Sequence, residues 1–322
     1  MNGRPVTGRL APTPSGYLHL GNARSFLLAW LWARSAGGNM ILRVEDIDAQ
    51  RCKPEFEEAA FDDLVWLGLW QRTPSPADNQ YHQSAKLEAY EAQLERLVQR
   101  GLAYPCTCSR RDIEAAASAP QGDQGPVYPG TCRDRWESFL HARSESGTEP
   151  AWRFRWDGPD VQFHDELCGD VAVSPAEEGD FVLWRKDGGP SYQLAVTVDD
   201  ADQGVTQVLR GRDLLTSTAR QLALYHALGL TPPDQWAHVP FVQDEHRRRM
   251  AKRDGDLSLI HLRESGVSAE RVVAFAAWSA GLLDEPAPIA ATELVGEFDL
   301  TRLNTEDFIV TDEHLDWLYA TK

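Results

Sequence analysis

In the N-terminal third of the chain, short apolar runs typical of strands alternate with longer apolar stretches typical of helices. The runs at residues 6–11 and 40–44 predict strands. Longer stretches predict helices at 20–33, 54–67 and 84–100, the second of them with a proline at its start, where proline fits best. Because strand and helix alternate, we expect a parallel sheet with helices packed on its faces, as in an α/β fold.

The pattern changes between residues 103 and 180 and then resumes. The changed stretch contains a segment rich in glycine, proline and serine at 106–132, and its apolar runs are short and β-like, as at 152–156. The α/β pattern resumes at 192–198 and predicts a strand at 205–210, a helix at 214–228 and a strand at 236–242. Beyond residue 257 the chain is mostly helical, with helices expected at 267–283 and 312–319. We therefore predict three parts: a sheet domain from residues 1–102 and 181–256, an insertion at 103–180, and a helical C-terminal module at 257–322.

Composition narrows the class of protein. A chain of 322 residues with 42% hydrophobic residues can bury a sizeable core. No apolar run approaches the roughly 20 residues of a membrane span, and the N-terminus lacks the apolar core of a signal peptide, so we expect a cytoplasmic protein with no membrane partner. The net charge of −17 disfavours a general nucleic-acid binder, and any contact with a polyanion should be local, as at the basic stretch 247–253.

The segment 9–22 combines a strand end, a proline–glycine turn and a helix start. The N–H groups at a helix N-terminus suit a triphosphate, and Gly21 would let a nucleotide approach the backbone closely. His19 and Asn22 are predicted to place hydrogen-bond donors one turn apart on the same face of that helix. The alternative is a proline-rich turn with a surface histidine, and agreement over the whole segment favours the nucleotide site.

Two further segments supply groups that could bind an amino acid. Glu45 follows the predicted strand 40–44, at the sheet edge where ligands of open α/β sheets bind, and its carboxylate could hold an ammonium group or a ribose hydroxyl. The alternative for Glu45 is a solvated acidic turn. A tyrosine hydroxyl and an arginine fork suit a carboxylate, and Tyr192 and Arg210 provide them. By pattern alone these two residues could equally be a core tyrosine and a surface arginine.

The five cysteines indicate a metal site more than disulfides, because their number is odd and no signal peptide is expected. Cys106, Cys108 and Cys132 cluster in the glycine- and proline-rich segment, and three thiolates suit zinc. A tetrahedral site needs a fourth ligand; the segment contains no histidine, which leaves Tyr128 as the candidate. The alternative is a set of buried cysteines without a metal.

These motifs resemble those of glutamyl-tRNA synthetases, which belong to the class I aminoacyl-tRNA synthetases. His19-Leu20-Gly21-Asn22 is similar to the class I His-Ile-Gly-His element, with Asn22 in place of the second histidine. Segments 43–48, 190–200 and 204–214 resemble the family's substrate-binding segments, and 249–253 resembles its Lys-Met-Ser-Lys-Ser loop with only the methionine and second lysine kept. The cysteines with Tyr128 resemble the zinc site of truncated paralogues of the family.

The resemblance implies a role for each matching residue. The glutamate-binding residues would be Arg9, Ala11, Thr13, Glu45, Tyr192 and Arg210. The ATP-binding residues would be His19, Gly21, Asn22 and Lys252. Of these, Lys252, His19 and Asn22 would act in catalysis, with ATP and Mg²⁺ as substrate and one structural zinc held by Cys106, Cys108, Tyr128 and Cys132. The fold implied is a Rossmann-like nucleotide-binding parallel sheet, split by a zinc-containing insertion that resembles an acceptor-binding domain and followed by the small helical module.

Chain length then selects a subgroup. Only about 70 residues follow Lys252, which is too few for the anticodon-binding domain of a full-length glutamyl-tRNA synthetase. The chain therefore resembles the stand-alone glutamyl-queuosine tRNA(Asp) synthetases, which activate glutamate without tRNA and transfer it to queuosine in the anticodon stem-loop of tRNA(Asp). Three alternatives stay open: a truncated discriminating enzyme that charges tRNA(Glu), another adenylate-forming enzyme of the same fold, and an inactive tRNA- or zinc-binding paralogue.

Overall fold

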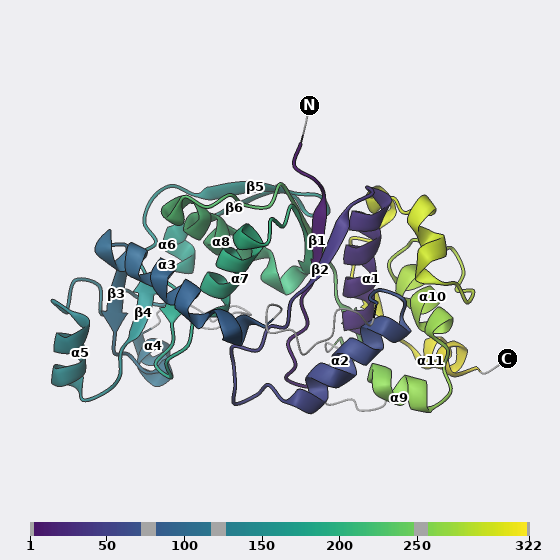
Figure 1. Cartoon of the computed structure of the whole chain (residues 1–322), viewed down its shortest axis with the longest axis horizontal. Helices are drawn as coiled ribbons and strands as arrows, with labels where there is room; N and C mark the ends of the chain where they lie inside the picture. The colour runs from purple at the N-terminus through teal and green to yellow at the C-terminus, as the bar shows by residue number, and fades with distance from the viewer. Residues whose placement is uncertain (1–2, 72–81, 117–126, 248–256, 321–322) are drawn as a thin grey trace.

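A computed structural model describes residues 3–71, 82–116, 127–247 and 257–320. At its centre, β1 (Thr7–Leu10) and β2 (Asn39–Leu42) pair in parallel, with Thr7 opposite Asn39. The helix α1 (Leu20–Ser35) connects them (Figure 1). The predicted strands 6–11 and 40–44 and helix 20–33 are confirmed to within a few residues.

A second parallel pair lies beside the first. The strands β8 (Gln207–Gly211) and β9 (Gln235–Val239) pair in parallel and are connected by η3 (Arg212–Leu214) and α8 (Leu215–Leu228). The backbone N–H of Thr206 donates to the carbonyl of Thr7 at 2.9 Å, and the side chain of Arg9 reaches the carbonyl of Leu209 at 3.4 Å. These contacts advance together along both strands, so β1 and β8 run in the same direction and their carboxyl ends face one region.

Near this pair, the structure defines one stretch whose type the pattern left open and corrects one predicted strand. The stretch at 192–198, where the α/β pattern resumes, is a helix, α7 (Tyr192–Asp202), capped by the Ser191 hydroxyl. The predicted strand 236–242 is divided into β9 and β10 (Val242–Gln243). Pro240 lies between the two pieces, and it cannot donate a ladder hydrogen bond because it has no N–H.

The chain between the two parallel pairs forms a separate antiparallel sheet. The strands β3 (Ala103–Cys106), β4 (Ala151–Phe154) and β7 (Val182–Trp184) lie in the order β3-β4-β7. In the chain, α2 (Pro54–Trp66) and η2 (Gln83–Lys86) precede this sheet, and α3 (Leu87–Gln99) packs against β3. The insertion contains the helices α4 (Arg110–Ala116), α5 (Phe139–Ser146) and α6 (Pro175–Glu178). The β-like pattern at 152–156 is therefore confirmed in part by β4.

The hairpin of β5 (Val161–Asp165) and β6 (Gly169–Val173) departs from this antiparallel sheet. It extends along α8 toward the parallel strands (Figure 1). The backbone N–H of Glu166 donates to the carbonyl of Trp236 in β9 at 2.8 Å. The segment predicted as an insertion therefore contacts the parallel strands directly.

The C-terminal part is helical, as predicted, but it shares its core with the sheet domain. It contains α9 (Leu259–Glu264), α10 (Ala269–Ser279) and α11 (Asp312–Tyr319), with η5 (Ala291–Glu297), η6 (Leu300–Arg302) and β11 (Phe308–Ile309) between the last two. The helix α10 packs on α1, and residues of both belong to one buried cluster. The helix predicted at 267–283 ends earlier, before Gly281, whose φ of +85° is unfavourable for other residues.

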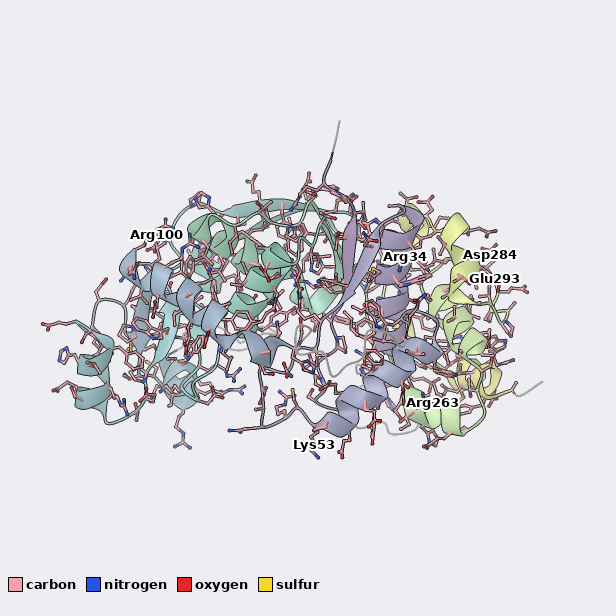
Figure 2. All side chains as sticks on the ribbon, in the orientation of Figure 1. Arg34, Lys53, Arg100, Arg263, Asp284 and Glu293 are labelled. Atoms are coloured by element: carbon pink, nitrogen blue, oxygen red, sulfur yellow. The ribbon has the colours of Figure 1, made fainter. Side chains whose placement is uncertain are left out.

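Charged side chains such as Asp284 and Glu293 project from the outer surface of this C-terminal part (Figure 2). Among the described helices, none has the length and apolar character needed to cross a membrane.

Candidate functional site

The carboxyl ends of β1 and β8 open into a cavity of about 650 Å³, a volume suited to a small ligand. Its wall contains every described residue predicted to bind glutamate or ATP, namely Arg9, Ala11, Thr13, His19, Gly21, Asn22, Glu45, Tyr192 and Arg210. Lys252, the remaining predicted residue, lies outside the described residues, as do Arg249, Ala251 and Arg253. The structure thus gathers into one cavity residues that lie far apart in the sequence.

His19 and Asn22 form the N-terminal cap of α1. Nδ1 of His19 accepts a hydrogen bond from the Gly21 N–H at 3.1 Å, and the Asn22 side-chain oxygen accepts one from the His19 N–H at 3.1 Å. This reciprocal capping box holds the helix N-terminus at the edge of the cavity. The replacement of the second histidine by Asn22 therefore has a local consequence that the sequence did not reveal: the asparagine side chain closes the cap.

Gly21 has a further role that the sequence did not indicate. A Cβ at this position would lie 3.0 Å from Cε1 of the His19 imidazole. Since real Cβ contacts are rarely so short, the absence of a side chain leaves room for the histidine ring at the helix start. Glycine here serves both the cap and the open approach to the backbone.

Glu45 lines the cavity and is 8% exposed. Its Oε1 accepts from Nη2 of Arg43 at 3.4 Å. Burial raises the pKa of Glu45, and the nearby guanidinium groups of Arg43 and Arg9 only oppose that shift. A ligand ammonium group beside this carboxylate would stabilise its ionised form.

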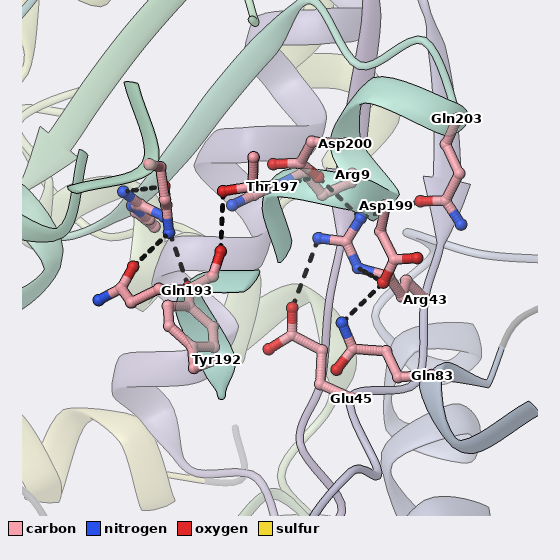
Figure 3. A network of polar contacts seen from close by, with 12 residues as sticks. Arg9, Arg43, Glu45, Gln83, Tyr192, Gln193, Thr197, Asp199, Asp200 and Gln203 are labelled. Atoms are coloured by element: carbon pink, nitrogen blue, oxygen red, sulfur yellow. Dashed lines mark hydrogen bonds and ion pairs between the residues drawn. The ribbon is translucent and has the colours of Figure 1, made fainter. Parts of the chain in front are cut away.

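Arg43 anchors Glu45 to a buried network that sequence reasoning missed (Figure 3). Its Nη1 donates to Asp200 at 2.7 Å and to the side chain of Gln203 at 2.8 Å, and its Nε lies 3.8 Å from Asp199. Both aspartates belong to the segment 190–200 that resembles the family motif, so their acidic character next to an apolar run was the available signal.

Asp199 also links α7 to η2 and α3. It accepts hydrogen bonds from Gln83 at 2.7 Å and from the Tyr90 hydroxyl at 2.9 Å. The Nε of Arg9 lies 3.6 Å from Asp200 and completes the cluster. Burial lowers the pKa of Arg9, an effect that Asp200 opposes and that Arg43 and Arg210 increase. A ligand carboxylate would relieve this repulsion between cations.

Tyr192 and Arg210, both expected to bind glutamate, contact each other. Nη1 of Arg210 lies 3.4 Å from the Tyr192 hydroxyl, and both side chains line the cavity. Burial raises the pKa of Tyr192, so its hydroxyl keeps its proton at neutral pH. Around Tyr192 the cavity presents the guanidinium groups of Arg9 and Arg210 and the carboxylate of Glu45. That distribution complements an amino acid that carries an additional carboxylate. The cavity lining also contains Arg24, Arg51 and Asp213.

The cysteine cluster lies in the antiparallel part of the structure. The sulfur atoms of Cys106, Cys108 and Cys132 all lie within 4.8 Å of one another, with 3.5 Å between the last two. The Tyr128 hydroxyl lies 3.4 Å from Sγ of Cys106 and 3.9 Å from Sγ of Cys108. Ligands at about 2.3 Å from a tetrahedral zinc lie about 3.8 Å apart, so the four groups fit a zinc ion.

The other two cysteines have different surroundings. Sγ of Cys52 lies 3.9 Å from the Glu45 carbonyl, and Sγ of Cys168 lies 3.8 Å from the His238 carbonyl. Neither belongs to the cluster.

The arginines of the insertion are largely paired with acids. Arg133 donates to Asp180 and to Asp157, the latter at 2.6 Å, and Arg110 donates to Glu114 at 3.0 Å. The side chain of Arg110 is 86% exposed, whereas that of Arg133 is 31% exposed. Arg133 therefore contributes more to the architecture of the insertion than to a basic surface.

Comparisons with known proteins show the family of this chain. The family model described as the catalytic domain of class I tRNA synthetases (E and Q) matches residues 5–317. The chain is 48% identical over 306 residues to a glutamyl-Q tRNA(Asp) synthetase from Symbiobacterium thermophilum, and the match covers 94% of each chain. It is 35% identical to a glutamate–tRNA ligase 2 from Syntrophus aciditrophicus, covering 99% of this chain and 66% of that relative.

A solved structure gives the same result for the fold. The crystal structure of a glutamate tRNA ligase from Elizabethkingia meningosepticum, in complex with its amino acid, superimposes with a TM-score of 0.81 at 26% identity and covers 98% of this chain and 69% of that one. The family resemblance predicted from the motifs is confirmed: this chain belongs to the class I tRNA synthetases of the E and Q family.

Proposed function

We propose that this protein activates glutamate with ATP to glutamyl-adenylate without tRNA and transfers the glutamyl group to queuosine in the anticodon of tRNA(Asp). The observation that carries the proposal is the single cavity lined by Arg9, Arg210 and Glu45. The acceptor is supported by similarity, since the chain is 48% identical to a glutamyl-Q tRNA(Asp) synthetase and 35% identical to a glutamate–tRNA ligase. The proposal keeps the cytoplasmic localisation expected from the sequence.

The proposed substrate pose follows from charge. Glu45 binds the ammonium group of glutamate, and Arg9 and Arg210 bind its two carboxylates, with the Tyr192 hydroxyl beside Arg210. Ala11 and Thr13 line the cavity where the chain leaves β1 and limit the space around the substrate. A shorter or longer acid would leave one guanidinium without a partner, which is costly in a buried site.

The proposed chemistry is an in-line displacement. A carboxylate oxygen of glutamate attacks the α-phosphorus of ATP, an acyl–phosphate bond forms, and pyrophosphate leaves with the electron pair of the broken bond. His19, Gly21 and Asn22 hold the phosphates at the N-terminus of α1, and Lys252 stabilises charge on the leaving pyrophosphate. Mg²⁺ bound to the phosphates supplies further neutralisation. A nucleophilic group of queuosine then displaces AMP from the adenylate.

The domain boundaries and the zinc belong to the same proposal. Residues 1–102 and 181–256 form the Rossmann-like catalytic domain, 103–180 the insertion that splits its sheet, and 257–322 the C-terminal module. Cys106, Cys108, Tyr128 and Cys132 hold one structural zinc that fixes the start of the insertion relative to its end. The alternative of an enzyme that charges tRNA(Glu) is less consistent with the lower identity, 35%, to a glutamate–tRNA ligase. A pyrophosphate-exchange assay distinguishes the proposed enzyme from an inactive paralogue.

The proposed acceptor predicts a selective labelling pattern. With ATP and labelled glutamate, label should enter queuosine-containing tRNA(Asp) but neither the same tRNA without queuosine nor tRNA(Glu), because only queuosine supplies the nucleophile. Acid-precipitable counts measure the transfer. Label on tRNA(Glu), or equal label with and without queuosine, would favour ordinary aminoacyl-tRNA synthesis.

Lys252→Ala should lower glutamate-dependent exchange of pyrophosphate into ATP by about 10²-fold or more, the usual effect of losing one donor that stabilises charge in the transition state. The exchange is measured without tRNA. Arg253→Ala removes a neighbouring cation and serves as the control, with exchange retained. An unchanged rate in Lys252→Ala would exclude this lysine from the mechanism.

Arg210→Ala should raise the KM for glutamate about 10- to 100-fold and change the KM for ATP much less, because a buried carboxylate loses its charged partner. Pyrophosphate exchange at varied glutamate and at varied ATP gives the two constants. Arg34→Ala, an exposed arginine at the far end of α1 (Figure 2), is the matched control. Parallel rises in both constants would argue against a role in glutamate binding.

One zinc per chain should co-purify, and Cys108→Ser should lose it and lower the melting temperature, since metal binding is coupled to folding of the insertion. Mass spectrometry of the metal content and thermal unfolding measure the two effects. Cys52→Ser, outside the cluster, should keep the metal. A fully folded wild-type protein without metal would contradict the zinc site.

A further inference from the structure

Behind Arg210 lies a chain of buried polar groups that the proposed reaction does not itself use. Nε of Arg210 donates to Nε2 of His238 at 3.0 Å, and Nδ1 of His238 lies 2.6 Å from Oδ2 of Asp165. His238 and Asp165 are both 0% exposed, and neither lines the cavity. The first belongs to β9 and the second ends β5, so the contact joins the hairpin of the insertion to the parallel strands.

The hydrogen bonds that Asp165 accepts determine which atoms of Asp165 and His238 carry protons. Oδ1 of Asp165 accepts from the backbone N–H groups of Leu167, Cys168 and His238 at 3.1, 2.9 and 3.2 Å. Burial opposes ionisation, but the hydrogen bonds from His238 and from the backbone hold the pKa of Asp165 below its ordinary value. The aspartate is therefore an acceptor only, and Nδ1 of His238 must carry the proton that lies between them.

His238 is consequently neutral and offers a lone pair to Arg210. Burial lowers the pKa of His238 to about 4, despite the hydrogen bond to Asp165. A second proton on the ring would place an N–H at Nε2 directly opposite the N–H at Nε of Arg210. The observed 3.0 Å contact instead requires Nε2 to accept.

The remaining contacts orient the guanidinium plane. Nη2 of Arg210 donates to the Thr218 hydroxyl at 2.7 Å and to the Gln221 side chain at 3.0 Å. With Nε and Nη2 engaged, Nη1 is the nitrogen directed at the cavity, and among the described residues its contact is the 3.4 Å approach to the Tyr192 hydroxyl. A planar fork held at two nitrogens can present the third in only one direction.

We propose that Asp165 and His238 are positioning residues for recognition of the glutamate carboxylate: Asp165 fixes the tautomer of His238, and His238 fixes the guanidinium of Arg210. This inference rests on the proposed role of Arg210 as a glutamate ligand. It assigns to the β5–β6 hairpin a part in amino-acid affinity although the hairpin does not line the cavity.

Asp165→Asn tests the tautomer directly. The amide oxygen of the asparagine can still accept from the backbone N–H groups. Its amide nitrogen then donates to Nδ1 of His238, so the ring proton moves to Nε2 and opposes the N–H of Arg210. The KM for glutamate in pyrophosphate exchange should rise about 10- to 100-fold, while kcat and the KM for ATP stay near their wild-type values. The ¹⁵N chemical shifts of His238 should change from the Nδ1–H to the Nε2–H tautomer.

A double-mutant cycle separates positioning from general stability. In His238→Gln the new side-chain carbonyl can accept from Arg210 whatever occupies position 165, so Asp165→Asn in that background should add no further rise in KM. If Asp165→Asn does not fold, His238→Leu and His238→Gln carry the test, and His238→Leu should have the KM for glutamate higher by about 10-fold or more.

The outcomes distinguish this inference from the proposed function. Absence of glutamate-dependent exchange in the wild type would overturn both. With exchange present, a changed tautomer in Asp165→Asn and an unchanged KM for glutamate would overturn the positioning role alone. Additive effects on the KM for glutamate in the double-mutant cycle would also overturn the positioning role alone. Equal KM values for His238→Leu and His238→Gln would do so as well.

Discussion

The buried guanidinium of Arg43 is the interaction on which the site depends. Arg43 is 1% exposed and lies among the carboxylates of Asp200, Asp199 and Glu45 (Figure 3). Burial opposes its charge, but the three acids more than offset this effect and raise its pKa above the ordinary value. Removing one partner from such a buried cluster leaves an uncompensated charge and costs about 3–5 kcal/mol. The cluster therefore holds the end of β2 against α7, and through Tyr90 and Gln83 it also holds α3 and η2 in place.

The same cluster determines the electrostatics of the cavity. Asp200 lies between Arg43 and Arg9, so the charge of the first arginine is neutralised mainly within the network and that of the second only partly, at 3.6 Å. Glu45 is likewise shared between Arg43 and the cavity, at the longer distance of 3.4 Å. The incompletely paired Arg9 and Glu45 therefore line the cavity, while the fully paired Arg43 does not. A substrate with opposite charges at matching positions would complete the pairing, so the site is electrostatically preorganised for it.

The insertion contributes to this arrangement at two separate places. Its cysteine cluster lies at the start of the antiparallel sheet, while its β5–β6 hairpin reaches β9 and contacts His238. The C-terminal helices similarly pack against α1, whose N-terminus borders the cavity. The segments that sequence patterns separate into modules therefore share contacts around one site, and a change in any of them can alter the position of the ligand-binding groups.

The sequence by itself determined the local features of this protein. Capping, turns and apolar periodicity act over a few positions, so neighbouring residues determine the elements they form. Such features are the start of α1 at residues 19–22, the two closely spaced cysteines at 106 and 108, and the strands around 6–11 and 40–44. The resemblance then grouped Arg9, Glu45, Tyr192 and Arg210, and the structure places all four in one cavity.

Only the tertiary structure decided the long-range pairs. Arg43 and Asp200 are 157 positions apart, and Asp165 and His238 are 73 apart. Arginine, aspartate and histidine are usually surface residues, and no periodicity marks those that become buried. Their burial is favourable only when folding brings each partner within hydrogen-bond distance, because a charge without its partner would be strongly destabilising there. That condition depends on chain topology, which local sequence patterns do not encode.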